Sequence, residues 1–265
     1  MPPGRSSTGS VELPGGGWCA GRIVVVMTAH VIGIGAATGG LGASTLAAAV
    51  ALRGASTGAR TVAVDTSRWG TALAVALGME SARGLHWEDL TRSDGDLPGD
   101  ELVAALPRAH GVHLLARDGI GEQTWADLPR QVVHHARRAA AGVADLVVVD
   151  LPPMGSPDFL GWASWCHQLR VLVGDAPGTV AVSPALRGAL GVVPGRTALL
   201  LRGGRPARGL VDAVQQVAGH PVTGSLAQDP SVGRCELEGS PVGSVPGPLQ
   251  ELADEVLLTA VEVAA

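Results

Sequence analysis

The sequence predicts an α/β fold in which a mostly parallel, doubly wound sheet is flanked by helices. Short apolar runs alternate with helical patterns along the chain, as in repeated strand–helix–strand units. These runs are continuously apolar and rich in β-branched residues, which indicates strands that are buried on both faces. The composition agrees, because 46% of the 265 residues are hydrophobic and only 16% are charged, so the core can be large.

The expected elements follow one another from residue 30 onward. Strands are expected at His30–Gly35, Thr61–Asp65, Gly111–Ala116, Asp145–Asp150, Leu169–Gly174 and Thr197–Leu201. Helices are expected at Ser44–Arg53, Thr124–Ala140, Thr179–Leu190, Gly209–Ala218 and Pro248–Val263. The second helix should carry its basic side chains, Arg130, His134, Arg137 and Arg138, on its outer faces. Residues 81–110 are polar and irregular, and are expected to form a surface insertion.

One domain, residues 30–265, is expected. Residues 1–29 contain a run rich in Pro, Gly and Ser, and are expected to be a disordered leader or to precede the true start, for which Met27 is a candidate. No segment has the ~18 consecutive apolar residues of a membrane span. The protein is therefore expected in the cytoplasm, without a membrane anchor of its own.

Charge and composition argue against several classes of function. The net charge of −5 and the pI near 5.9 argue against direct nucleic-acid binding, which needs a basic patch. All 19 basic residues are Arg, and the chain has neither Lys nor Tyr, so a mechanism that needs either side chain is excluded. Cys19, Cys166 and Cys235 form no CxxC pair and no zinc pattern, as expected of reduced thiols.

A glycine-rich loop joins the first strand to the first helix. Gly39, Gly40 and Gly42 permit positive φ angles and a close approach to the backbone. Successive N–H groups at the start of a helix form a cradle for an anion, which the helix dipole also favours. The alternative is a plain strand-to-helix turn. The expected nucleotide-binding residues are Gly39, Gly40, Leu41, Gly42, Ala43, Ser44 and Thr45.

A hydroxyl and two acids complete the candidate site at the carboxyl ends of the strands, where parallel sheets bind ligands. Ser44 stands where a hydroxyl would reach a Mg²⁺ ion. Asp150 ends a strand, as does the acid that orients the water shell of that metal. Ser44 and Asp150 are therefore expected to hold Mg²⁺, directly or through its waters. Asp65 is a second candidate catalytic acid, although a helix cap or turn residue fits it equally well.

A dinucleotide-binding fold is a rival interpretation, because Asp65 follows the glycine loop at about the distance of the acid that binds ribose. The G-x-G-x-x-G pattern fails, however, since the third position after Gly33 and Gly35 is Thr38. A short-chain dehydrogenase would also need a Tyr and a Lys in its active site. An oxidoreductase is therefore only a minor alternative.

These motifs resemble those of the MinD/ParA superfamily of P-loop ATPases. Residues 38–45 (TGGLGAST) resemble the deviant Walker A motif, K-G-G-x-G-K-[ST]-[ST], and residues 144–153 (ADLVVVDLPP) resemble its Walker B strand and switch. The runs GGLGASTLA and DLVVVDLP are similar to the CpaE/TadZ-like branch, which includes the actinobacterial septum site-determining (Ssd) proteins. The resemblance covers roughly residues 30–250, and implies a P-loop NTPase fold with ATP or ADP and Mg²⁺ as ligands.

The departures from that family pattern bear on activity. The signature lysine that reaches the neighbouring protomer's phosphates maps to Thr38, and the P-loop lysine maps to Ala43. Ser67 stands where a second acid often accompanies Asp65, and the asparagine that often contacts adenine maps to Arg202. Because phosphoryl transfer is catalysed mainly by positioning and electrostatic stabilisation, the missing lysines imply weak or absent hydrolysis.

Three hypotheses of function remain open. The first is a hydrolysis-deficient, nucleotide-binding positioning protein, which protein partners recruit to the septum or pole in cell-division regulation or in localising a Tad pilus or secretion machine. The second is an active ATPase with a substitute cation from Arg68, Arg205 or Arg208. The third is a nucleotide-free interaction scaffold, for which the six tryptophans are candidate contacts. Any homodimer is expected to form without being driven by ATP, because Thr38 carries no charge.

Overall fold

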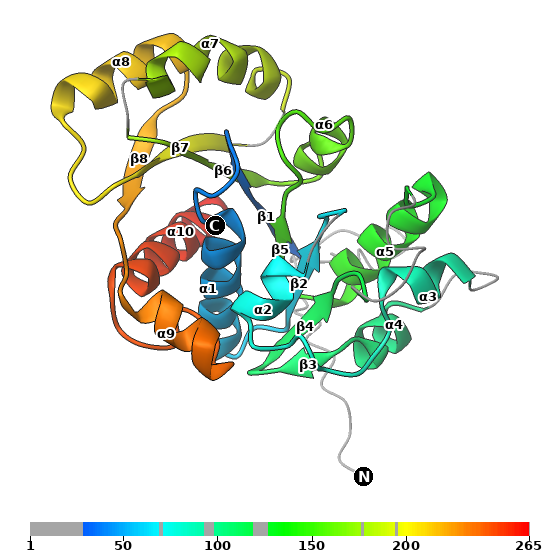
Figure 1. Ribbon diagram of the computed structural model, residues 1–265. Coiled ribbons are helices and arrows are strands. Elements are labelled where there is room, and N and C mark those ends of the chain that lie inside the picture. Colours follow the sequence, from blue (N-terminus) through cyan, green and yellow to red (C-terminus); the bar gives the residue numbers. More distant parts are fainter. Residues whose placement is uncertain are drawn as a thin grey trace, which may run out of the picture.

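The central sheet has eight strands and lies between two layers of helices, as the predicted fold class requires (Figure 1). This computed structural model describes residues 29–68, 71–92, 98–118, 127–175, 178–193 and 196–264. The expected leader, residues 1–29, lies outside the described residues except for Ala29. Within the described chain, no helix is long and apolar enough to cross a bilayer.

The strands are arranged in the order β3-β4-β2-β5-β1-β6-β7-β8. They are β1 (His30–Ala36), β2 (Thr61–Asp65), β3 (Arg108–Ala109), β4 (Val112–Leu115), β5 (Leu146–Asp150), β6 (Gln168–Val173), β7 (Arg196–Arg202) and β8 (Val222–Leu226). β3 pairs with β4 in antiparallel fashion, and all other pairs are parallel. β5 lies between β1 and β2, so the carboxyl ends of these three strands meet at one edge of the sheet.

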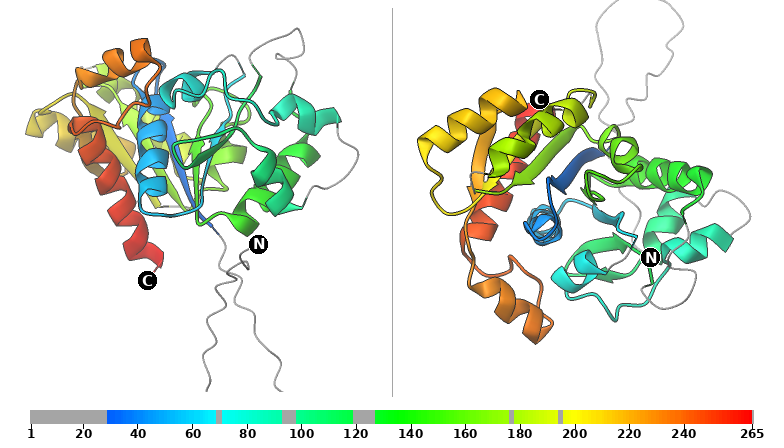
Figure 2. Two further views of the ribbon diagram at one scale, coloured as in Figure 1. Left: turned by 90° about the horizontal axis from the view of Figure 1, so that it is seen from below. Right: turned by 45° about the horizontal axis from the view of Figure 1, so that its top comes forward.

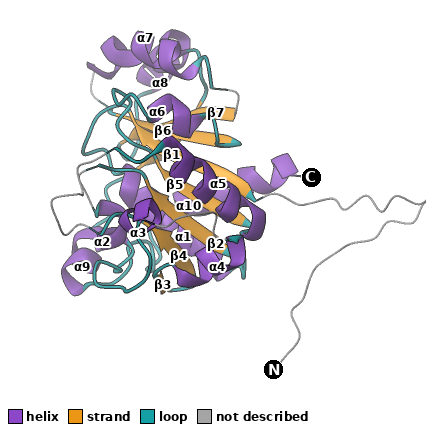
Figure 3. Cartoon of the chain, turned by 90° about the vertical axis from the view of Figure 1, so that its right-hand side faces the viewer, coloured by secondary structure: helices purple, strands orange, loops and turns teal. Residues whose placement is uncertain are grey.

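Helices cover both faces of the sheet (Figure 3). One face is covered by α1 (Ala43–Ser56), α2 (Ala72–Ala76), α9 (Ser231–Glu238) and α10 (Pro248–Ala264). The other is covered by α3 (Trp87–Arg92), α4 (Gly99–Ala105), α5 (Arg130–Val143), α6 (Phe159–Ala163), α7 (Gly178–Leu190) and α8 (Arg208–Ala218).

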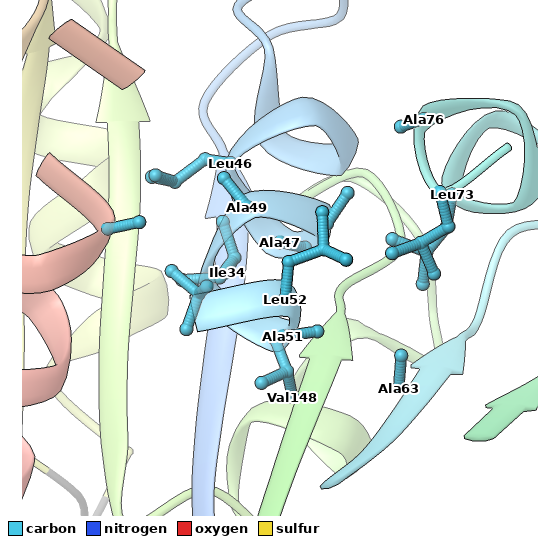
Figure 4. Packing of buried hydrophobic residues seen from close by; sticks show 14 of the residues in the cluster. Ile34, Leu46, Ala47, Ala49, Ala51, Leu52, Ala63, Leu73, Ala76 and Val148 are labelled. Carbon is cyan, nitrogen blue, oxygen red and sulfur yellow. The ribbon is translucent and has the colours of Figure 1, made fainter. Parts of the chain in front are cut away.

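The helix α1 is enclosed on nearly all sides, although it follows the candidate ligand loop directly. Its alanine-rich middle is buried against Ile34 of β1 and Val148 of β5 (Figure 4). Small side chains allow this close approach, and a helix that is apolar all round is typical of a core position. On its other side α10 lies alongside it (Figure 2), where Arg53 donates two hydrogen bonds to Asp254 at 2.6 and 3.1 Å. The loop is therefore anchored to a rigid element.

The prediction that residues 81–110 form an irregular surface insertion is wrong. This segment contains α3 and α4, and Trp87 is only 1% exposed. The Trp87 indole donates a hydrogen bond to the carbonyl of Asp65 at 2.9 Å, so the segment packs directly behind the end of β2. Its described acids, Glu88, Asp89, Asp100 and Glu101, lie in the first turns of these two helices, where the helix dipole favours negative charge. The prediction failed because a short helix with mostly polar residues and one buried side has the same composition as a polar loop.

The helix predicted at residues 124–140 is observed at Arg130–Val143, and residues 119–126 lie outside the described chain. Its basic residues do not all point outward, as the prediction required. Arg137 is half-buried, and its guanidinium carbon lies 3.9 Å from the centre of the Trp162 ring. Trp162 is itself 5% exposed, so this stacking interaction forms part of the boundary between α5 and α6.

Candidate functional site

The glycine loop between β1 and α1 adopts the backbone conformation that its sequence predicts. Gly40 and Gly42 have φ angles of 78° and 91°, in the left-handed region that favours glycine. Gly42 begins α1 without a side-chain cap, and the first turn of that helix contains no acid. Within the described chain, the amides of residues 38–45 donate no hydrogen bond to any other group. A row of free donors therefore faces outward at the positive end of a helix.

A cavity of about 620 Å³ lies in front of this loop, within the range of roughly 300–1,000 Å³ that is typical of ligand sites. A Cβ atom added at Gly39 or Gly40 would meet nothing within 4 Å, so the space beside these glycines is open. The lining residues are Ala36, Thr38, Gly39, Gly40, Leu41, Gly42, Ala43, Ser44, Thr45, Ser67, Thr71, Ala72, Val75, Asp150, Leu151, Pro152, Pro153 and Glu236. All seven residues predicted to bind nucleotide are among them.

Ser44 and Asp150 converge on one wall of this cavity. The Ser44 hydroxyl donates a hydrogen bond to the Asp150 carboxyl group, which is 4% exposed. The Thr66 hydroxyl and amide both donate to the Asp150 carbonyl, at 2.7 and 3.2 Å, and hold the end of β5 beside the end of β2. A hydroxyl and a carboxylate are therefore placed side by side at the foot of the glycine loop.

Asp65 lies behind this wall and does not line the cavity. It is in register with Asp150 across the β2–β5 pair and is 1% exposed. Its Oδ1 atom accepts a hydrogen bond from the Ser67 amide at 2.8 Å, whereas Oδ2 is buried without a partner in the described chain. Its position suits support of the loop after β2 better than contact with a ligand in this cavity.

Asp65 and Asp150 lie close together and are buried, and both have raised pKa values. Burial raises the pKa of Asp65 to about 6, although the amides of Ser67 and Leu73 oppose this effect. Burial raises the pKa of Asp150 well above its usual value, the charge of Asp65 raises it further, and the Ser44 hydroxyl opposes both. Two neighbouring buried carboxyl groups strongly disfavour a double negative charge. A divalent cation at this position would reverse that preference.

The Ser44 hydroxyl and the Asp150 carboxylate suit a Mg²⁺ ion that takes its remaining ligands from water and phosphate. In the described chain, no group of three or more His, Cys, Asp or Glu residues is arranged to hold a metal ion. A cation here would thus have the Ser44 hydroxyl, the Asp150 carboxylate, waters and ligand oxygens as its neighbours. Mg²⁺ is often bound in this manner, through one or two protein groups and substrate phosphates.

The described lining of the cavity contains no cation, and its only acids are Asp150 and Glu236. The arginines expected as substitutes lie elsewhere. Arg68 pairs with Asp127 at 2.7 Å and Asp158 at 3.1 Å, away from the glycine loop. Arg205 and Arg208 are exposed and do not line the cavity. Both positions of the family's lysines, Thr38 and Ala43, do line it.

Arg202, which stands at the adenine-contacting position of the resembled family, is engaged within the chain. Its guanidinium donates to the carbonyls of Leu226 and Ala227, each at 2.9 Å, and to the Gln228 side chain at 3.0 Å. Sequence reasoning also missed two wall residues, Val75 of α2 and Glu236 of α9, and Thr66, which supports Asp150 from behind the wall. Only Thr66 had a usable signal, because it directly follows the acid at the end of β2.

No family model matches the sequence. Two curated proteins of Mycobacterium tuberculosis do match: the uncharacterized proteins MT3760 of strain CDC 1551 / Oshkosh and Rv3660c of strain H37Rv. Each is 30% identical over 203 residues, which cover 72% of this chain and 53% of the relative. The chain thus spans about half the length of the curated relatives it matches.

Solved structures of similar fold cover nearly the whole domain. A ParA family ATPase from Chlorobium tepidum matches with a TM-score of 0.72 and 18% identity over 87% of this chain and 98% of that one. MinD in the Aquifex aeolicus MinC:MinD complex matches with a TM-score of 0.64 and 19% identity over 86% and 96%. MinD with Mg-ADP from Pyrococcus horikoshii matches with a TM-score of 0.63 and 15% identity over 86% and 96%. At these identities the likeness shows a shared fold.

Proposed function

We propose that this chain, which has the fold of the ParA and MinD ATPases, binds ATP or ADP with Mg²⁺ and hydrolyses ATP slowly or not at all. The observation that carries the proposal is the glycine-loop cavity itself. Free amides line it on one side, the hydrogen-bonded Ser44 and Asp150 lie at its foot, and alanine occupies the position of the expected cation.

In this proposal the chain binds the nucleotide, but the described residues of the cavity supply no side-chain cation to stabilise the transition state of hydrolysis. The amides of the glycine loop hold the phosphate oxygens, as at other helix N-termini. Ser44 and Asp150 position Mg²⁺ or its waters, and Asp65 holds the loop after β2 in place. Mg²⁺ supplies the positive charge that the described lining lacks, so nucleotide binding should depend strictly on the metal. With no side-chain cation from the described lining on the phosphates, a major part of the transition-state stabilisation is missing.

The cellular role we propose is spatial. Residues 30–265 would act as one nucleotide-binding domain of the CpaE/Ssd type in the cytoplasm, and protein partners would recruit it to the septum, the pole or a Tad pilus or secretion machine. The resemblance of residues 38–45 and 144–153 to that branch supports this role. The fold neighbour MinD, seen in complex with MinC, supports a protein partner.

Titration with fluorescent ADP and ATP analogues, with and without Mg²⁺, tests the proposal together with a phosphate-release assay. We expect Mg²⁺-dependent binding of both nucleotides and little or no phosphate release. Turnover would favour an active ATPase with a cation supplied in trans. Failure of either nucleotide to bind would favour a nucleotide-free scaffold and contradict the proposal.

Mg-ATP is expected to leave the oligomeric state of the protein unchanged. Thr38 lines the cavity where the family's signature lysine would stand, and its short neutral side chain neither crosses an interface nor neutralises a phosphate. A ligand shifts an equilibrium only through different interactions with its two states, and Thr38 supplies no such difference. Sedimentation velocity with Mg-ATP, Mg-ADP and no nucleotide measures this. A monomer-to-dimer shift with Mg-ATP alone would show that another cation replaces the lysine.

A further inference from the structure

A second cavity, of about 440 Å³, is lined by residues of α5 and α6, two helices on the face of the sheet opposite to α1. We propose that this cavity, called here the arginine cavity, binds a phosphoryl group carried by a small molecule or by a phosphorylated side chain. Four arginines and two aspartates line it, so cations outnumber acids among its described residues. The proposal does not depend on the nucleotide site described above.

One helix supplies most of the cationic wall. Arg130, His134 and Arg137 are spaced at i, i+4 and i+7 along α5, which places them on one face of the helix, and all three line the cavity. Arg68 and Arg117 complete the wall from the loops that follow β2 and β4. The cavity therefore also lies at the carboxyl edge of the sheet, where ligands of parallel sheets bind.

Two of these arginines are already neutralised. Arg68 pairs with Asp127 and Asp158, at 2.7 and 3.1 Å. Arg117 is 5% exposed and pairs with Glu88 at 3.3 Å. These pairs leave Arg130 and Arg137 as the available cations among the described residues of the cavity.

Arg137 is a cation without a counter-ion in the described chain. Its guanidinium lies over the Trp162 ring, and its Nε atom is buried without a hydrogen-bond partner. The nearby Cys166 thiol supplies no negative charge at neutral pH, because burial raises its pKa to about 12. Burial lowers the pKa of Arg137, yet a guanidinium stays protonated in proteins. A half-buried charge without a counter-ion is costly, and a bound anion would offset that cost.

The start of α5 points to the same ligand. The helix begins with Arg130 after Pro129, has no side-chain cap, and carries no acid in its first turn. A cation in the first turn opposes the helix dipole, whereas an anion there would interact favourably with the dipole, the free amides and Arg130 together. Guanidinium groups with helix amides are the usual donors to phosphate oxygens. Because Arg137 covers the Trp162 ring, charge rather than base stacking selects the ligand.

The arginine cavity shares two loops with the glycine-loop cavity. Thr66 and Arg68 line the first and Ser67 lines the second, while the loop after β5 gives Asp158 to the first and Pro152 to the second. An anion that contacts Arg68 competes with Asp158 and moves the loop that begins at Asp150. Occupancy should therefore change nucleotide affinity, and this last consequence rests on the proposed function.

Isothermal titration with inorganic phosphate, O-phospho-L-serine and glucose 6-phosphate, at low ionic strength, tests the site. We expect at least one to bind, and Arg137→Gln to weaken binding about tenfold or more, as loss of a charged hydrogen-bond partner does. Arg138→Gln is the matched control, because Arg138 is the next residue of α5, exposed and outside the cavity, and should bind as the unaltered chain does. Tighter binding of one organic phosphate identifies the source of the phosphoryl group.

Arg130→Gln provides a second variant at an exposed position, should Arg137→Gln fail to fold. It is expected to weaken phosphate binding severalfold. Phosphate bound at the glycine loop instead would be displaced by Mg-ADP and unaffected by either variant, and that result would overturn the inference. So would the absence of binding by all three ligands. Arginine-dependent phosphate binding in a protein that binds no nucleotide would overturn the proposed function alone.

Discussion

Ala43→Lys is expected to tighten the binding of Mg-ADP and Mg-ATP about 10- to 100-fold, since a charged hydrogen bond contributes roughly 1.5–3 kcal/mol. Ala43 is the first residue of α1 and lines the glycine-loop cavity, whose described walls hold no other cation. The new ammonium group would enter a site already shaped by free amides. It would also lie near Asp150, favour that carboxylate, and so help Mg²⁺ to bind. Slow phosphate release is expected to begin in this variant.

Fluorescent-nucleotide titration of Ala43→Lys against Ala43→Met separates charge from bulk. Methionine has a comparable reach without the ammonium group, and should leave nucleotide affinity unchanged or lower it. Equal affinities for Ala43→Lys and the unaltered chain would mean that the glycine loop does not hold phosphate. Tightening by methionine as well would assign the effect to packing.

Asp150→Asn is expected to raise the free energy of unfolding at pH 8 in the absence of Mg²⁺, while abolishing Mg²⁺-dependent nucleotide binding. The pKa values of Asp65 and Asp150 are both raised in the folded state, so the folded chain binds more protons than the unfolded one. The contribution of these two groups to stability is therefore greatest below the unfolded pKa near 3.8, and is lost as pH rises through about 6 for Asp65 and higher for Asp150. Asparagine keeps the shape of Asp150 and removes the repulsion.

Urea unfolding at pH 5 and pH 8, with and without Mg-ADP, measures this effect. The unaltered chain should lose stability between the two pH values and regain it with Mg-ADP, whereas Asp150→Asn should change less in both respects. Asp212→Asn is a matched control, because Asp212 is exposed on α8 and is distant in the sequence from both Asp65 and Asp150. A loss of stability in Asp150→Asn at pH 8 would show that the carboxylate is compensated by a group already in the chain.

Much of the fold was predictable because its strands are continuous apolar runs. β2 begins and ends at the predicted residues, Thr61 and Asp65, and β7 extends one residue beyond the prediction at each end. The helices α2, α3, α4, α6 and α9 were missed, because five to eight residues are too few to show a helical period. Their stability comes from tertiary packing, such as that of Trp87, rather than from local propensity.

The candidate site was predictable in its loop and in the meeting of Ser44 with Asp150, because the carboxyl ends of neighbouring parallel strands share one edge. Its outer walls were not predictable. Val75 and Glu236 reach the cavity from helices far apart in sequence, and no local pattern marks them. The arginine cavity was missed for a similar reason. The sequence of α5 predicts that its basic residues face solvent, whereas Arg137 packs over Trp162 of α6, which is distant in the sequence.

Because α10 packs against α1, the core around α1 can be completed only after α10 has been synthesised. Arg53 and its partner Asp254 are separated by 201 positions in the sequence. The apolar helix α1 therefore leaves the ribosome long before α10, which covers it, has been synthesised. Until then its alanine-rich surface is available to chaperones and to other nascent chains. Glu236, part of the cavity wall, also belongs to this late segment. Ligand capture thus has to wait until α10 has been synthesised, and a ribosome that stalls before α10 would release a chain prone to aggregate rather than a weaker binder.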